Sequence, residues 1–249
     1  MSKKIRADEL LVLQKLAESR SKAQAYILAG QVRLGEDKIQ KSSQLLPSDA
    51  QLVLKNQMPY VGRGGLKMEN FLNDSHWSIS GINFLDLGAS TGGFTDCLLQ
   101  KGAKTATCVD VGRGQLHYKL RIDDRVTNLE KMNLKTLTQD DLPQPYYPLI
   151  VMDLSFISLR KVIRQAWQFL EPGGRLATLV KPQFECKKEE ADLGKGIIKD
   201  STIHLRVLDE IKSFVRQELI DSNLIIETTS RPTGNDGNKE FFLGWVKEP

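Results

Sequence analysis

Charged residues close four apolar, strand-like runs in the later part of the sequence. Each of the runs 82–86, 106–110, 149–153 and 176–181 ends in one of them: Asp86, Asp110, Asp153 and Lys181. A single residue of this kind is usually a helix cap or a turn residue. Ligands of an open parallel sheet bind beyond the carboxyl ends of its strands. Four charged strand ends in succession therefore favour a functional site at that edge.

The first of these runs leads into a glycine-rich loop with the sequence Asp-Leu-Gly-Ala-Ser-Thr-Gly-Gly-Phe. Glycine lets the backbone turn sharply and lets a ligand approach closely. The loop supplies the cofactor-binding candidates Asp86, Gly88, Ser90, Thr91, Gly92, Gly93 and Phe94. Its spacing is not Gly-x-Gly-x-x-Gly and no Gly-Lys-Ser/Thr follows, so neither a dinucleotide fingerprint nor a P-loop is present. An unrelated nucleotide-binding α/β domain remains an alternative.

The same loop resembles that of S-adenosylmethionine-dependent methyltransferases. An acidic residue precedes the glycines, and Asp110 ends the next strand about 24 positions later. The resemblance implies that the loop cradles the methionine part of the cofactor. It also implies that Asp110 accepts hydrogen bonds from the ribose hydroxyls of the cofactor. Met132 and Asn133, after the third strand, are weaker candidates for the adenine pocket.

A second set of residues determines the expected reaction type: Lys67, Asp153, Lys181 and Glu240. If the last strand is antiparallel, Glu240 at its start lies on the same rim as the ends of the other strands. The order Lys-Asp-Lys-Glu is then similar to that of ribose 2′-O-methyltransferases of the FtsJ type. Taken singly, Lys181 could be a surface or cap residue and Glu240 a hairpin charge, so the interpretation depends on the four together.

The chemistry of hydroxyl methylation gives these residues separate roles. A hydroxyl is a poor nucleophile until a base takes its proton. A buried lysine can be that base where desolvation and a neighbouring cation disfavour its charged form. Lys181 is the candidate base, Lys67 the neighbouring cation and Asp153 the group that orients Lys181. Glu240 would hold Lys67 or the ribose in place. The segment Asp-Leu-Ser-Phe lacks the prolines of the Asn/Asp-Pro-Pro-Tyr/Phe motif that base-amino methyltransferases use.

Other classes of protein find little support. The three histidines are scattered and unpaired with carboxylates, so no metal site is expected. The three cysteines show no CxxC spacing, which argues against a zinc ribbon or a disulfide framework. The apolar runs fall short of the roughly 20 residues of a membrane span, and the N-terminus does not lead into a signal-peptide apolar region. We therefore expect a cytoplasmic protein.

The positive charge of the chain is concentrated at its start. Residues 1–60 contain ten Lys/Arg and six Asp/Glu, whereas the remaining residues contain 25 of each. A basic module attached to a neutral one suggests that the first binds a polyanion, although a merely solvated basic surface would have the same composition. The segments 6–12, 19–23 and 27–32 resemble the αL RNA-binding fold. The resemblance gives the RNA-binding candidates Lys4, Arg6, Arg20, Lys22 and Lys41, and Arg63 of the linker is a further candidate.

Periodicity predicts how these parts are organised. Leu10, Leu13 and Leu16 recur at helical spacing, and a second helix is expected from a cap at Ser21 to Gly30. Short strands are expected at 32–34 and 52–54, a linker at 57–65 and a helix at 66–73. Strands of the second domain are expected at 82–86, 105–110, 125–128, 148–153, 175–181, 224–229 and 240–246. Helical segments alternate with them, which is typical of a mostly parallel sheet covered on both faces.

Taken whole, the chain is identified as a member of the TlyA family, whose members carry the names of haemolysins and of ribosomal RNA methyltransferases. The resemblance includes Arg63-Gly-Gly-Leu-Lys67, Val-Lys181-Pro-Gln-Phe-Glu and Asn-Lys-Glu240-Phe. It implies a Rossmann-like class I methyltransferase domain (66–249) with a seven-stranded α/β sheet, behind an α+β αL domain (1–56). It also implies S-adenosylmethionine as cofactor and a cytidine ribose in ribosomal RNA as substrate. A non-catalytic RNA-binding or ribosome-assembly factor and a membrane-lytic protein are the alternatives.

Overall fold

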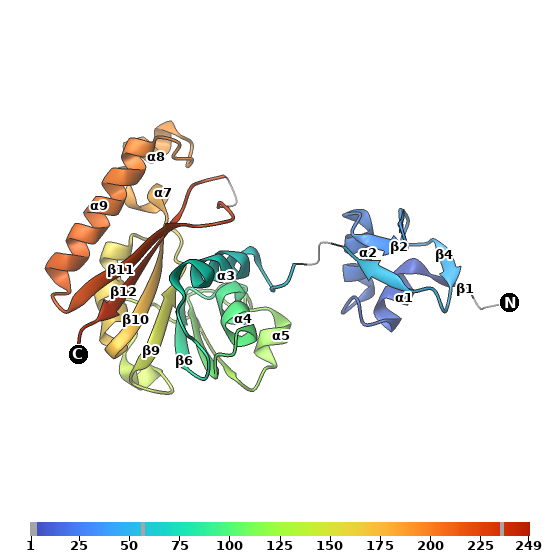
Figure 1. The fold of residues 1–249 in the computed structure, drawn as a ribbon, viewed down its shortest axis with the longest axis horizontal. Coiled ribbons are helices and arrows are strands. Elements are labelled where there is room, and N and C mark those ends of the chain that lie inside the picture. The colour runs from blue at the N-terminus through green and yellow to red at the C-terminus, as the bar shows by residue number, and fades with distance from the viewer. Residues whose placement is uncertain (1–3, 56–57, 235–236) are drawn as a thin grey trace. The chain divides into compact units, whose positions relative to one another are not determined.

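The larger of two units carries a seven-stranded sheet (Figure 1). The computed structural model describes residues 4–55, 58–234 and 237–249. It divides into a first unit, Met1–Met58, and a second unit, Pro59–Pro249. The strands of the second unit are β6 (Asn83–Leu87), β7 (Thr105–Asp110), β8 (Val126–Glu130), β9 (Tyr147–Met152), β10 (Leu170–Val180), β11 (Ser222–Thr229) and β12 (Phe241–Lys247).

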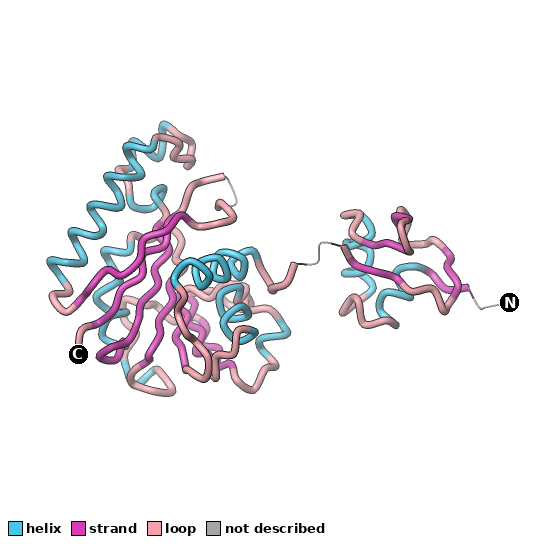
Figure 2. Tube along the Cα trace, viewed as in Figure 1, coloured by secondary structure: helices cyan, strands magenta, loops and turns pink. Residues whose placement is uncertain are grey.

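The strands of this sheet lie in the order β11-β12-β10-β9-β6-β7-β8. From β10 to β8 all neighbours are parallel, whereas β12 is antiparallel to both β10 and β11. Val180, at the end of β10, pairs with Phe241, at the start of β12. The start of β12 therefore lies on the rim where the parallel strands end, as the sequence analysis required. Figure 2 shows the strands side by side.

Helices cover both faces of the sheet because its strands are apolar on both sides. In β9, Leu149 and Val151 face one core layer while Ile150 and Met152 face the other. The first layer lies under α3 (Arg63–Ser75), α4 (Gly93–Gln100) and α5 (Tyr118–Arg121). The second layer lies under α6 (Ile163–Gln168) and α9 (Ser201–Glu218). The short elements η1 (Gln139–Asp141), η2 (Leu159–Lys161), α7 (Pro182–Glu185) and α8 (Lys188–Leu193) complete the unit.

The first unit has its own small core of residues such as Leu10, Leu11 and Ile27. Its helices are α1 (Ala7–Leu13) and α2 (Arg20–Leu28), and its strands are β1 (Lys4–Arg6), β2 (Val32–Leu34), β3 (Asp37–Lys38), β4 (Leu45–Pro47) and β5 (Leu52–Leu54). The strands form a two-stranded β1-β4 sheet and a three-stranded β3-β2-β5 sheet. Among the described residues, no helix of either unit is both long and apolar enough to cross a bilayer.

Several element boundaries differ from the sequence analysis. The second helix of the first unit is capped by Ser19, whose Oγ accepts from the backbone N–H of Lys22, and not by Ser21. Gly30 follows that helix with a φ of +70°, as expected of a residue that ends it. The helix after the linker begins at Arg63 instead of Leu66, so it includes three residues assigned to the linker. Strands β1, β3 and β4 were not predicted.

Candidate active site

Two adjoining cavities open at the carboxyl ends of the parallel strands. One has a volume of about 370 Å³ and is lined by Asp110, among others; we call it the Asp110 cavity. The other has a volume of about 570 Å³ and is lined by Lys67 and Lys181, among others; we call it the two-lysine cavity. Both are lined by Gly88, Ser90, Asp153, Ser155 and Phe156, so the two form one continuous site.

The two-lysine cavity brings together all four residues of the predicted Lys-Asp-Lys-Glu set. Lys67 comes from α3, Asp153 follows β9, Lys181 follows β10 and Glu240 precedes β12. Lys67 is the fifth residue of its helix and does not open it. The four residues are far apart in the chain, and the rim of the sheet makes them neighbours.

Each lysine of this cavity is paired with one of the two acids. Nζ of Lys67 lies 2.5 Å from Oε2 of Glu240, and Nζ of Lys181 lies 2.5 Å from Oδ1 of Asp153. Lys181 also donates a hydrogen bond to Oγ of Ser155 at 3.0 Å. The lysines are 8% and 9% exposed, so both ammonium groups are held largely out of water. An ion pair in such surroundings is fixed in orientation, because few other partners can satisfy it.

The glycine-rich loop lines both cavities through Gly88 and Ser90. Gly88 has a φ of +84°, and a Cβ there would lie 2.9 Å from the carbonyl oxygen of Asp153. The loop therefore approaches the strand end closely only because position 88 is glycine. Gly93 begins α4, where its Cα faces the backbone of Gly64 and Gly65 at the start of α3. Helix α3, which carries Lys67, thus packs directly against the loop.

Asp110 is fixed at the mouth of its cavity by two backbone groups. Its Oδ2 accepts from the N–H of Ser90 at 2.8 Å and its Oδ1 from the N–H of Gly112 at 2.7 Å. Met132 and Asn133 line the same cavity, together with Val111, Leu154 and Ile157. A fixed carboxylate beside a mostly apolar wall can hold a sugar hydroxyl next to a flat ring.

Asp86 is a buried carboxylate in the wall of the two-lysine cavity. Its Oδ2 accepts a hydrogen bond from Oγ1 of Thr95 at 2.6 Å, while Oδ1 has no hydrogen-bond partner among the described residues. Burial raises the pKa of Asp86 to about 7, against the lowering effect of Thr95. A buried carboxylate oxygen without a partner is unfavourable, and a donor or cation of a bound ligand would relieve it.

Most of the predicted site residues line this pair of cavities. Gly88 and Ser90 line both, while Asp86, Thr91, Gly93 and Phe94 line the two-lysine cavity. Gly92 contributes differently: its φ is +90°, and a Cβ there would lie 2.2 Å from the side chain of Leu120. It permits the packing of α5 against the loop. Arg63 lines the two-lysine cavity and donates to the carbonyl oxygen of Thr233 at 2.8 Å.

The cavities also contain residues that the sequence did not predict as site residues: Ser155, Phe156, Gln183 and Phe184. Phe156 is 91% exposed, has a φ of +63° and lies 5.1 Å from the ring of Phe184 between centroids. Oε1 of Gln183 is buried without a hydrogen-bond partner among the described residues. Their place in the sequence could have indicated them, because each follows Asp153 or Lys181 by two or three residues.

The other predicted RNA-binding residues lie in the first unit. Arg6 and Arg20 both donate to the buried carboxylate of Asp8, at 2.9–3.1 Å. Lys22 lies over the ring of Tyr26 at 5.6 Å, and Lys4 and Lys41 are exposed. The two arginines are thus held side by side by an acid of the core. Across the described part of both units, no three His, Cys, Asp or Glu residues group as metal ligands would.

Comparisons with known proteins agree with this geometry. The FtsJ-like methyltransferase family model matches residues 60–247. YqxC of Bacillus subtilis is 43% identical over 244 residues, which cover 97% of this chain and 85% of YqxC. The 16S/23S rRNA (cytidine-2′-O)-methyltransferase TlyA of Mycobacterium tuberculosis is 35% identical over 249 residues, covering 99% of this chain and 91% of TlyA.

A solved structure from Streptococcus thermophilus is similar over the whole chain. It has a TM-score of 0.74 and 36% sequence identity, and the match covers 100% of this chain and 90% of that one. More distant methyltransferase structures, such as a Synechocystis enzyme at 13% identity and a TM-score of 0.51, share the fold of about 75% of the chain. The family match, the full-length relatives and the rim of paired charges agree: this chain belongs to the FtsJ-like methyltransferases, in the TlyA family.

Proposed function

We propose that this protein methylates the 2′-hydroxyl of a cytidine ribose in ribosomal RNA, with S-adenosylmethionine as methyl donor. The observation that carries the proposal is the two-lysine cavity, in which Lys67–Glu240 and Lys181–Asp153 face one space. The ribosomal substrate and the cytidine are supported by the name of the Mycobacterium tuberculosis relative. A ribosomal RNA substrate also favours a cytoplasmic location.

The cofactor has a fitting place in the site. When bound, S-adenosylmethionine supplies a methyl group already activated by a sulfonium sulfur. Asp110 is placed to accept from ribose hydroxyls, and Met132 and Asn133 would contact the adenine ring. The free Oδ1 of Asp86 lies under the neighbouring cavity, where it can face a positively charged group. These residues would bind and orient the donor between the two cavities.

The paired lysines would prepare the hydroxyl. Lys181 is the residue to take the ribose proton, and Asp153 with Ser155 fixes the direction of its Nζ. Lys67 is a second ammonium in the same cavity. Glu240 holds Lys67 in place. Positioned proton transfer contributes about 10²–10⁴-fold in rate, and alignment of the reacting atoms adds further decades.

The first unit would grip the RNA. We propose that residues 1–56 form an αL RNA-binding domain, with Lys4, Arg6, Arg20, Lys22 and Lys41 facing phosphates. Arg63, at the rim of the two-lysine cavity, would contact the RNA near the target nucleotide. Phe156 presents an exposed ring beside the same cavity, where an unstacked base could lie against it.

The test is transfer of labelled methyl groups to purified small and large ribosomal subunits. Wild-type protein should label at least one subunit, and the labelled nucleotide should resist alkaline cleavage, as a 2′-O-methyl nucleotide does. Lys181→Ala should lose about 10²–10⁴-fold in rate while still binding S-adenosylmethionine. Lys104→Ala, an exposed lysine at the amino end of β7, is the matched control and should remain active.

Two results would reject the proposal in favour of an alternative. Wild-type protein that binds subunits but transfers no methyl group at any assembly stage would indicate a non-catalytic ribosome-assembly factor. Lysis of membranes that survives Lys181→Ala would indicate a membrane-lytic protein.

A further inference from the structure

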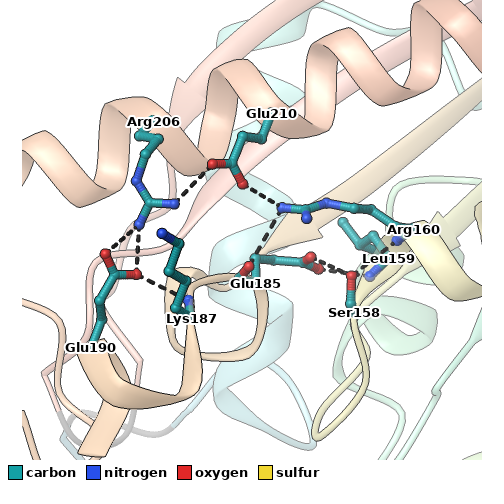
Figure 3. Close-up of polar contacts among 8 residues, drawn as sticks. All are labelled: Ser158, Leu159, Arg160, Glu185, Lys187, Glu190, Arg206 and Glu210. Carbon is teal, nitrogen blue, oxygen red and sulfur yellow. Dashed lines mark hydrogen bonds and ion pairs between the residues drawn. The ribbon is translucent and has the colours of Figure 1, made fainter.

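A buried carboxylate lies just behind the two-lysine cavity. Glu185 ends α7 and is 7% exposed. Its Oε1 accepts from the backbone N–H of Leu159 and its Oε2 from Oγ of Ser158, each at 2.6 Å (Figure 3). Burial raises the pKa of Glu185, while these two hydrogen bonds lower it. Both carboxylate oxygens are therefore committed to the segment that begins η2.

Glu185 joins the two segments that carry Asp153 and Lys181, one of the two ion pairs of the two-lysine cavity. Residues 153–158 follow β9 and include Asp153, Ser155 and Phe156. Residues 181–185 follow β10 and include Lys181 and Phe184. Lys181 contacts Asp153 and Ser155 at one end of the paired segments, and the rings of Phe156 and Phe184 meet between them. Glu185 closes the other end.

Hydrogen bonds hold the segment 153–158 at its ends, and Leu154 and Ile157 pack against the core between them. It contains neither helix nor strand, and Phe156 has a φ of +63°, which is unusual for a bulky residue. Its start is anchored by the N–H of Asp153, which donates to the carbonyl oxygen of Leu87 at 3.3 Å. Its end is anchored at Ser158 and Leu159 by Glu185. A strained backbone persists only where its surroundings determine it, so the anchors decide where Asp153 and Ser155 lie.

A second group of charged residues lies outside Glu185 and, unlike Glu185, is partly exposed to solvent. Arg160 donates to Glu210 at 2.9 Å, and Arg206 joins Glu210 to Glu190 (Figure 3). The side chains of these outer residues are 24–38% exposed. Exposed ion pairs contribute little individually, whereas Glu185 is buried and both of its carboxylate oxygens accept hydrogen bonds from the loop after β9. The outer layer thus provides the control for the inner one.

We propose that Glu185 is a positioning residue for methyl transfer: it locks the loop after β9 to the helix after β10 and so fixes the Lys181–Asp153–Ser155 geometry. The inference rests on the proposed function. Glu185 does not line either cavity and would touch neither RNA nor cofactor. Its effect should therefore appear in the rate of the chemical step and not in the binding of either substrate.

The experiment compares Glu185→Ala, Glu185→Gln and Glu210→Ala in the full-length protein. Each variant is titrated with S-adenosylmethionine by calorimetry, and kcat is expressed per cofactor-binding site, so that unfolded protein does not count. Glu185→Ala should lower kcat about 10²-fold, the loss typical of reacting groups displaced by about 1 Å. The Kd for the cofactor and the KM for ribosomal subunits should stay near their wild-type values. Glu210→Ala should retain wild-type kcat.

Glu185→Gln is the conservative rescue. A glutamine oxygen can accept from Leu159 N–H, and its amide can donate to Ser158 Oγ, so kcat should return to within roughly fivefold of wild type. Ser158→Ala removes one bond with less disturbance of the core and should give an intermediate loss, which keeps the test decisive if Glu185→Ala does not fold. An unchanged kcat in Ser158→Ala and Glu185→Ala would overturn the role, as would a loss explained wholly by fewer cofactor-binding sites. Inactive wild-type protein, by contrast, would overturn the proposed function itself.

Discussion

Nζ of Lys67 lies 2.5 Å from Oε2 of Glu240, although 173 positions separate the two residues. The side chains are 10% and 4% exposed, so this is a buried ion pair. It joins α3, at the start of the second unit, to the residue before β12, at its end. A buried ion that loses its partner keeps its desolvation cost. The pair therefore has consequences for stability as well as for the proposed chemistry.

Removing one member of this pair should destabilise the second unit. We expect Lys67→Met and Glu240→Gln to lower the free energy of unfolding by about 3–5 kcal/mol each, because each removes one buried charge and leaves the other uncompensated. The double variant should lose less than the sum, by about 1–3 kcal/mol. The measurement is urea unfolding followed by tryptophan fluorescence. Trp77, Trp167 and Trp245 all lie in the second unit, so the signal reports on that unit.

Asp209→Ala is the matched control for this cycle. Asp209 forms an ion pair with Lys212, but its side chain is 74% exposed. Its removal should change stability by less than about 1 kcal/mol. Single variants at positions 67 and 240 that lose no more than this control would show that the pair is not buried as described.

A second prediction concerns the close contact between α3 and the glycine-rich loop. A Cβ on Gly93 would lie 2.8 Å from the backbone nitrogen of Gly65 and 3.1 Å from Cα of Gly64. These are backbone atoms and cannot move aside as a side chain can, and overpacking lowers stability by about 1–3 kcal/mol. Gly93→Ala should therefore move α3 away from the loop and weaken S-adenosylmethionine binding by about tenfold or more. Calorimetric titration measures the change.

Gly64→Ala tests whether this effect is specific. A Cβ there would lie 3.4 Å from the ring of Phe94 and 3.7 Å from Cα of Gly93, and both are ordinary contacts. Cofactor affinity should stay close to the wild-type value in this control. If Gly93→Ala binds S-adenosylmethionine as tightly as the wild type, Gly93 does not pack against the backbone of Gly64 and Gly65 as described.

The rim of charges was predictable from the sequence because strands impose a simple geometry. Each run that ends in Asp86, Asp110 or Asp153 carries its last residues to the same edge of a parallel sheet. The structure extends β6 one residue past Asp86 without changing this arrangement. The place of Glu240 required one added assumption, an antiparallel last strand, which the pairing of β12 with β10 confirms.

The start of α3 was not predictable in the same way. Gly64 and Gly65 have low helix propensity, so the sequence analysis assigned them to a linker. In the structure both are helical, and position 65 has to be glycine because a Cβ there would lie 2.3 Å from the ring of Tyr60. Glu185 escaped notice for a similar reason. Its partners lie 26 and 27 positions away, and no spacing rule connects an acid to a loop at that distance.

A third prediction follows from the buried Asp86. Burial raises its pKa to about 7, whereas the group ionises near 3.8 in the unfolded chain. Between these values the folded state keeps a proton that the unfolded state has released, so the free energy of unfolding should fall as pH rises from about 4 to 7. The fall should be on the order of 4 kcal/mol and should level off above pH 7. Asp86→Asn, which has no proton to lose, should remove it.

The measurement is urea unfolding of cofactor-free protein at pH 5, 6, 7 and 8, again by tryptophan fluorescence. Asp209→Asn, which changes an exposed aspartate, should keep the wild-type dependence on pH. If Asp86→Asn and the wild type lose stability in parallel between pH 5 and 7, some other group titrates and Asp86 is already ionised.

The last prediction concerns RNA binding by the first unit, where Arg6 and Arg20 share the carboxylate of Asp8. The guanidinium of Arg6 holds the pKa of Asp8 well below its usual range. Removing either arginine would disturb this buried acid as well as any RNA contact.

Exposed Lys41 gives a cleaner test. Lys41→Ala should weaken binding to all RNA sequences alike and reduce the slope of log K against log salt by about 0.7–0.9, the contribution of one phosphate contact. Lys38 is an exposed lysine of the same unit outside the predicted set, so Lys38→Ala should leave the slope unchanged. A slope lowered equally in both variants would indicate a diffuse basic surface instead of a defined RNA-binding face.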